Sequence, residues 1–150
     1  MKRDLIGIDT NVLIPAFISS HPNHKKAKAI FEEGLQRKRE LCITQQILAE
    51  FFSVVTRAGT PPLSCREAAD IVLYLNNLRR IRKIYPNRSV IKNCLILCLK
   101  YRIRGAKFFD ALYATTLLNK GVKKLLTQNV KDFYFFREEG LEILNPFESV

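Results

Sequence analysis

Short apolar runs alternate with longer segments of helical periodicity along this chain. The first run, residues 5–8, is rich in aliphatic and β-branched side chains, which is typical of a buried strand. Similar runs predict strands at 41–43, 81–85, 124–127 and 141–144. Because helical segments separate the strands, the pattern favours an α/β fold in which helices cover a parallel sheet.

Polar residues that commonly begin helices stand before the amphipathic segments. Asn23, Thr44 and Asn87 are such residues, and Ser64 forms a capping box with Glu67. The apolar positions that follow recur at helical spacing, so each of these residues opens a predicted helix. The predicted helices span residues 23–39, 44–59, 64–80, 87–101 and 108–119.

Length and composition limit the possible classes of protein. With 150 residues, of which 47% are hydrophobic and 26% charged, the chain is expected to form one globular domain over residues 1–150. No apolar run approaches the roughly 18 residues of a membrane helix, so we expect no membrane partner. Four scattered cysteines without a CxxC pair indicate reduced thiols in a cytoplasmic protein and offer no zinc site.

The net charge of +11 is concentrated in one part of the chain. Residues 71–109 contain ten basic and no acidic side chains, whereas the remainder holds 15 basic and 14 acidic ones. Such a block favours a polyanionic partner, either a nucleic acid or an acidic protein surface, and less so a membrane surface. A solubilising helix face explains the same charge equally well from the sequence alone.

Three of the 14 acidic residues lie at unusual positions in the pattern. Asp9 follows the first strand, at the edge where open parallel sheets bind ligands, although it also suits a helix N-cap. Glu50 shares a helical stripe with Ile47 and Val54, where burial is costly unless the carboxylate is paired or binds a cation; at an edge position it would reach water or Arg57. Asp110 lies in a first helical turn, where the helix dipole favours it, yet its stripe is apolar. Each position therefore has both a structural and a functional explanation.

A fourth polar group, Thr127, Asn129 and Asp132, follows the strand at 124–127. It lies beyond a strand end, as Asp9 does, although Asn129 also suits a tight turn. If these carboxylates converge, two of them about 4 Å apart repel by roughly 4 kcal/mol, so the site would need protons or a cation. Oxygen donors select hard ions such as Mg²⁺ or Mn²⁺. Sequence signatures of serine hydrolases, P-loop NTPases and dinucleotide enzymes are absent.

Short segments of this chain resemble, in order, the motifs of the PIN-domain ribonucleases. Each motif is short, but together they extend over essentially the whole chain. The resemblance implies a PIN-like, three-layer α/β/α fold with a central parallel sheet of four to five strands. The segments are IDTNVL (8–13), ITQQILAEF (43–51), GAKFFDALYA (105–114), LTQNVKDF (126–133) and LEILNPF (141–147).

The resemblance also implies an activity, metal-dependent endoribonuclease cleavage. Clustered acids in that family bind Mg²⁺ or Mn²⁺ and hydrolyse RNA phosphodiester bonds. Carried over to this chain, the metal-binding acids are Asp9, Glu50 and Asp110. Thr10 and Thr127 match family hydroxyls near the catalytic site.

One position departs from the family pattern. Asn129 stands where the family often has Asp, and an Asn supplies an oxygen ligand without a charge. Asp132 could take its place, so the resemblance does not specify whether one metal ion or two are bound. Asn11 matches a residue that usually holds the acidic loop in position.

Small PIN proteins of this length most resemble the VapC-like toxins of toxin–antitoxin pairs. That resemblance implies an RNA substrate, a cognate antitoxin and a homodimer. Among the basic residues, we expect Arg102, Arg104 and Lys107 to bind the RNA backbone, because they lie closest in sequence to Asp110. The alternative is a PIN-like RNA- or protein-binding module that has lost cleavage, which Asn129 favours. A flavodoxin-like signalling domain fits less well, because the segment around its third strand holds no acid.

Overall fold

Five parallel strands form the central sheet of this computed structural model, which describes residues 3–57, 59 and 61–148. The strand order is β3-β2-β1-β4-β5, so β1 lies in the middle and both of its neighbours run parallel to it. The sheet confirms the predicted α/β class and the strand number. The strands are β1 (Leu5–Ile8), β2 (Glu40–Thr44), β3 (Arg82–Ile84), β4 (Lys124–Leu126) and β5 (Glu142–Leu144).

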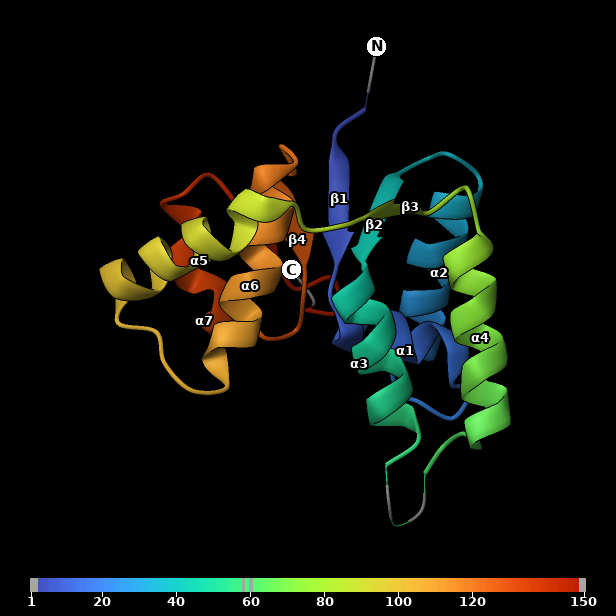
Figure 1. Cartoon of the computed structure of the whole chain (residues 1–150). Helices are drawn as coiled ribbons and strands as arrows, with labels where there is room; N and C mark the ends of the chain where they lie inside the picture. The colour runs from blue at the N-terminus through green and yellow to red at the C-terminus, as the bar shows by residue number, and fades with distance from the viewer. Residues whose placement is uncertain (1–2, 58, 60, 149–150) are drawn as a thin grey trace.

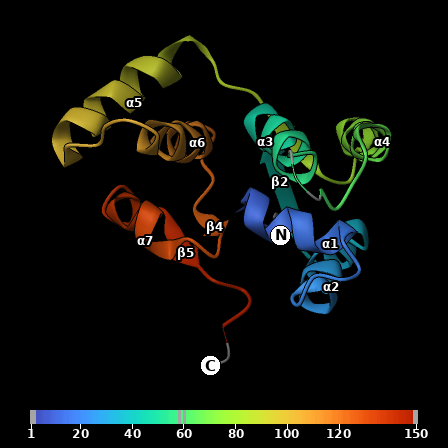
Figure 2. The same cartoon turned by 90° about the horizontal axis from the view of Figure 1, so that it is seen from below.

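Helices cover both faces of this sheet, as the three-layer prediction requires. Figures 1 and 2 show α1–α4 grouped on one side of β1 and α5–α7 on the other. The two groups face each other beyond the carboxyl end of β1. The helices are α1 (Thr10–Phe17), α2 (His24–Leu35), α3 (Gln45–Val55), α4 (Cys65–Asn77), α5 (Arg88–Tyr101), α6 (Lys107–Asn119) and α7 (Val130–Phe133), followed by the short 3-10 helix η1 (Tyr134–Arg137).

Helix starts were predicted more accurately than helix ends. Thr44 and Ser64 cap α3 and α4 as expected, and the capping box of Ser64 with Glu67 is formed. However, α2, α3 and α4 end at residues 35, 55 and 77, not at 39, 59 and 80. After α4 the Lys83 ammonium donates to the carbonyls of Leu75 and Leu78, which satisfies two carbonyl groups at the end of this helix.

Helix α6 packs closely on β1 because β1 has a glycine at the point of contact. A Cβ atom on Gly7 would lie 2.8 Å from Leu117 Cδ1, which is too close for a real contact. The fully buried Tyr113 donates a hydrogen bond of 2.6 Å to the carbonyl of Ile8, the residue before Asp9. These contacts hold the middle and the last turn of α6 against β1, and so place the helix that carries Asp110 relative to the strand that precedes Asp9.

The aromatic run after β4 behaves as a short amphipathic segment. Phe133 and Phe136 are buried in the core, whereas Tyr134 and Phe135 are exposed. None of the helices in the described part of the chain is long and apolar enough to cross a membrane.

Candidate active site

Asp9 lies at the centre of the candidate site, immediately after β1. It is the N-cap of α1 and is only 8% exposed. One carboxylate oxygen, Oδ1, accepts a 2.7 Å hydrogen bond from the backbone N–H of Thr10. The other, Oδ2, accepts a 2.7 Å bond from the Thr127 hydroxyl. Asp9 therefore caps α1, and this structural role is compatible with its predicted place in the site.

Thr127 and Asn11 form a rigid support around this carboxylate. Thr127 follows β4 and is fully buried, and its hydroxyl also accepts a 3.0 Å hydrogen bond from the N–H of Asn129. The Asn11 amide lies 3.4 Å from Asp9 Oδ2 and 3.3 Å from the Thr127 hydroxyl. Its carbonyl oxygen accepts a 3.0 Å bond from the N–H of Gln128. Asn11, in the first turn of α1, thus joins the segment after β1 to the loop after β4.

Glu50 reaches the same region from α3. Its Oε2 atom accepts a 2.8 Å hydrogen bond from the Thr10 hydroxyl, and its Oε1 atom accepts a 3.0 Å bond from the Gln46 amide. Both carboxylate oxygens are therefore held by uncharged donors. Among the described residues its hydrogen-bond partners do not include Arg57, which was the ordinary explanation for an acid at this position.

Asp110 is half-buried in the first turn of α6, where the pKa of its carboxyl is raised above its usual value. Burial raises the pKa of its carboxyl to about 6. The negative charges of Asp9, Asp132 and Glu50 act in the same direction. The Lys107 ammonium opposes them. Carboxylates carried by four separate segments therefore form one electrostatic cluster, and Lys107 lies near enough to act on it.

The pKa of Asp9 is also raised from its usual value, mainly by burial. The hydrogen bonds from Thr127 and from the Thr10 backbone oppose this rise, while the charges of Glu50 and Asp132 add to it. The cluster is thus a site that favours added positive charge, either protons or a cation. Oxygen donors of this kind suit a hard divalent ion. In residues 3–57, 59 and 61–148, no three carboxylate, imidazole or thiol side chains already form a preassembled metal-ligand set.

The fourth acid whose charge acts on Asp9 and Asp110 is Asp132, whereas Asn129 carries no charge. Asp132 is half-buried in α7, and its charge acts on both Asp9 and Asp110. Asn129 is exposed and takes part in the site's hydrogen bonds through its backbone N–H. The aligned motif position alone could not distinguish these two residues, because the distinction depends on which of them the fold brings near Asp9 and Asp110.

The basic side chains of residues 71–109 differ in their contacts. Arg102 ends α5 in a left-handed conformation with φ of 55°, and Arg104 and Lys107 follow it as exposed residues. Lys83, by contrast, caps α4, and burial lowers its pKa. Lys100 pairs with Glu139 at 3.0 Å. Part of the segment's charge therefore also serves the fold, and attraction of a polyanion by the segment stays a prediction.

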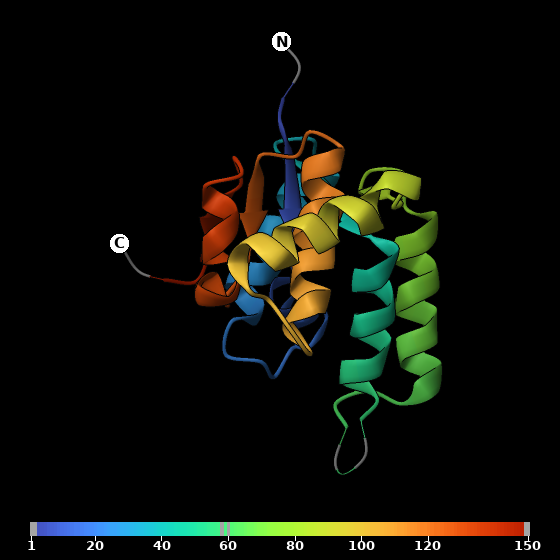
Figure 3. The same cartoon turned by 60° about the vertical axis from the view of Figure 1, so that its left-hand side comes forward.

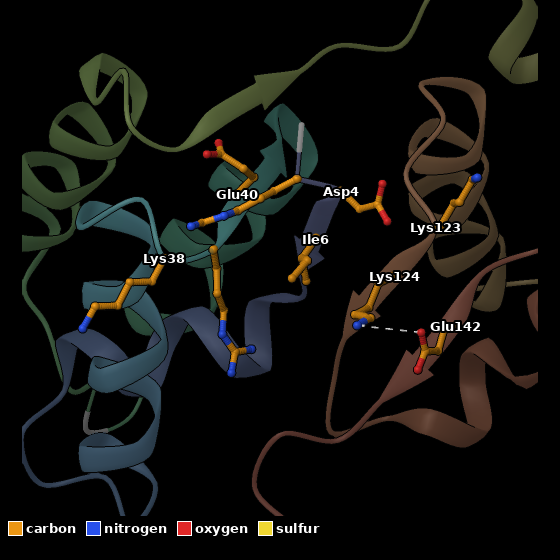
Figure 4. A pocket seen from close by; sticks show the side chains of 9 residues that line it. Asp4, Ile6, Lys38, Glu40, Lys123, Lys124 and Glu142 are labelled. Carbon is orange, nitrogen blue, oxygen red and sulfur yellow. Dashed lines mark ion pairs between the residues drawn. The ribbon is translucent and has the colours of Figure 1, made fainter. Parts of the chain in front are cut away.

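A hollow of about 790 Å³ lies at the opposite edge of the sheet, at the amino ends of the strands. Figure 4 shows its mixed charges, with the Lys124 ammonium facing the Glu142 carboxylate at 3.9 Å. Asp4 and Glu40 also line it, so its basic side chains have acidic neighbours. It contains none of the acids around Asp9, and its size does not make it a better candidate than the cluster.

The PIN domain family matches residues 6–136 of this chain. The match extends from within β1 to within η1 and includes the acids on α3 and α6. The chain therefore belongs to the PIN domain family, and the resemblance in its motifs is confirmed.

Individual relatives agree with this family. Ribonuclease VapC24 of Mycobacterium tuberculosis H37Rv is 29% identical over 134 residues, which cover 88% of this chain and 91% of that protein. The crystal structure of M. tuberculosis VapC20, a sarcin-ricin loop cleaving toxin, aligns with a TM-score of 0.68 at 14% identity, over 91% of this chain and 97% of that one. VapBC-1 from nontypeable Haemophilus influenzae aligns with a TM-score of 0.66 at 19% identity, over 96% and 99%. At these identities the structural matches establish the fold.

Proposed function

We propose that this chain is a metal-dependent endoribonuclease of the VapC type, the toxin of a toxin–antitoxin pair. The observation that supports this most is the carboxylate cluster at the carboxyl end of the central strand, in a chain of the PIN family. The relative VapC24 is named a ribonuclease, and several structural neighbours are toxin–antitoxin complexes. A cytoplasmic location follows from the same proposal and stays a prediction.

Asp9, Glu50 and Asp110 are the proposed metal ligands, with Asp132 as the fourth acid. A bound Mg²⁺ or Mn²⁺ would activate water and neutralise charge on the phosphoryl group. The raised pKa of Asp110 fits this role, since a cation would compensate the repulsion that now disfavours its ionised form. Thr127 holds the Asp9 carboxylate in one orientation.

Arg102, Arg104 and Lys107 are the proposed contacts to the RNA backbone. They lead along the loop from α5 into the helix that carries Asp110. If all three bind phosphate, replacing them together by Ala should reduce the slope of log K against log salt by about 2 for single-stranded RNA. An unchanged slope would instead favour the explanation that these charges only keep the protein soluble.

The function is tested by incubating the purified chain with total bacterial RNA and sequencing the new 5′ ends. We expect cleavage at defined sites with Mn²⁺ or Mg²⁺, none in excess EDTA, and recovery when Mn²⁺ is restored. Full activity in EDTA would exclude the metal-dependent reaction. RNA binding without any cleavage would instead favour the alternative, a PIN-like binding module that has lost its activity.

The proposed partners are a cognate antitoxin and a second copy of this chain. A small neighbouring reading frame that encodes a DNA-binding protein is the expected source of the antitoxin. Co-expression should yield a stable complex without ribonuclease activity. Light scattering on the purified toxin tests the homodimer, which requires twice the mass of one chain.

A further inference from the structure

Gln46 is an uncharged side chain that contacts two acid-bearing helices, α3 and α6. It lies in the first turn of α3, four residues before Glu50, so both side chains project from the same helix face. Its amide nitrogen lies 3.0 Å from Glu50 Oε1 and 2.9 Å from the carbonyl oxygen of Phe109. Phe109 directly precedes Asp110, so this one amide group links α3 to α6.

Chemistry fixes the orientation of this amide. Both of its neighbours are acceptors, a carboxylate oxygen and a carbonyl oxygen, and the NH₂ group offers two donors. The flipped amide would place an oxygen against both acceptors and leave its own donors without them. The observed orientation is therefore the one that binds both groups.

The link matters because α3 and α6 belong to different helix groups. Figure 3 shows α3 and α6 running alongside each other, and a groove of about 360 Å³ lies between them, lined in part by Gln45, Gln46 and Phe109. The other carboxylate oxygen of Glu50 accepts a hydrogen bond from the hydroxyl of Thr10, the residue next to Asp9. Gln46 thereby completes a chain of contacts through which the three proposed metal-binding acids are held relative to one another.

We propose that Gln46 is a positioning residue, which sets the separation of Glu50 and Asp110 for a divalent cation. This inference rests on the proposed metal-dependent function. Residues that orient metal ligands typically change metal affinity or activity by about 10–100-fold when they are removed. We expect an effect of that size on Mn²⁺ binding, with little effect on RNA affinity.

The test compares Gln46→Met with Gln45→Met. Met retains the length and helix propensity of Gln but has no amide donors. Gln45 is the matched control, because it is the exposed neighbour that lines the same groove and makes no side-chain hydrogen bond to any residue that the structure describes. Gln46→Asn keeps the amide but is one methylene too short, and it serves as a second variant should Gln46→Met fold poorly.

Mn²⁺ binding is measured by calorimetry without RNA, and cleavage is measured across Mn²⁺ concentrations. We expect Gln46→Met and Gln46→Asn to raise the Mn²⁺ dissociation constant and the Mn²⁺ concentration for half-maximal cleavage about tenfold or more, with the KM for RNA unchanged. Gln45→Met should match the wild type.

Two results separate the possible failures. A Gln46 variant with lower thermal stability but wild-type Mn²⁺ binding would show a purely structural link between α3 and α6 and overturn the proposal. Absence of both Mn²⁺ binding and cleavage in the wild type would instead refute the proposed function on which it rests.

Discussion

The replacement Asp110→Asn should stabilise the metal-free protein while it abolishes RNA cleavage. The pKa of this carboxyl rises on folding from 3.8 to about 6, so the folded state binds the proton more tightly than the unfolded state. Between these two pH values the folded state retains protons that the unfolded state has lost, so stability falls as the pH rises. At pH 7.5 the wild type has lost all of the stability that the protonated Asp110 contributes. The Asn variant cannot ionise at this position and loses none of it.

The structure sets the size of the effect. The rise in the pKa of Asp110 corresponds to about 3 kcal/mol if the carboxyl were fully shielded from solvent. Because the side chain is only half-buried, solvent screening reduces the expected gain of the Asn variant to about 1–2 kcal/mol. This gain reflects a site in which clustered carboxylates reduce stability in exchange for function.

Urea unfolding in EDTA, followed by circular dichroism at pH 4 and pH 7.5, measures this difference. The variant should exceed the wild type at pH 7.5 and match it at pH 4. Asp70→Asn is the control, since Asp70 is an exposed acid in an i,i+4 pair with Arg66 and should change stability by less than about 0.5 kcal/mol. An Asp110→Asn variant that is no more stable than the wild type at pH 7.5, or one that cleaves RNA at the wild-type rate, would refute the reasoning.

Two further predictions concern the residues around Asp9. Thr127→Val removes a buried hydroxyl with three hydrogen bonds and should cost about 1–3 kcal/mol in urea unfolding. It also raises the pKa of Asp9, so the rising limb of the pH–rate profile should move to higher pH; a limb at the same or lower pH would contradict this. Asp132→Asn should slow cleavage about 10–100-fold, whereas Asn129→Ala should leave the rate unchanged. A larger loss of rate in Asn129→Ala than in Asp132→Asn would instead identify Asn129 as the fourth site residue.

The sequence was sufficient to predict the places of the principal acids. Asp9 follows a strand in the middle of the sheet. Glu50 lies on a helix whose start could be located from its cap Thr44, and Asp110 lies on a helix that periodicity alone indicated. Parallel strands end at one edge, so an acid after β1 had to lie at the carboxyl edge of the sheet. These inferences need only local patterns and the direction of the strands.

The contacts between distant segments could not be predicted in the same way. Gln46 forms its bond to Phe109 across 63 residues, and only the packing of α3 beside α6 reveals that partner. Its spacing of four from Glu50 was a usable signal that local reasoning did not single out. Lys83 likewise counted as surface charge in the sequence, although the fold uses it to satisfy carbonyl groups at the end of α4.

The central claim is that the cluster around Asp9 binds a divalent cation and cleaves RNA with it. The most direct test titrates Mn²⁺ into wild-type protein and into Asp9→Asn, with binding and RNA cleavage measured on the same preparations. The account predicts that binding and cleavage rise together in the wild type and that both are lost in the variant. Mn²⁺-dependent cleavage of equal rate in Asp9→Asn would contradict it.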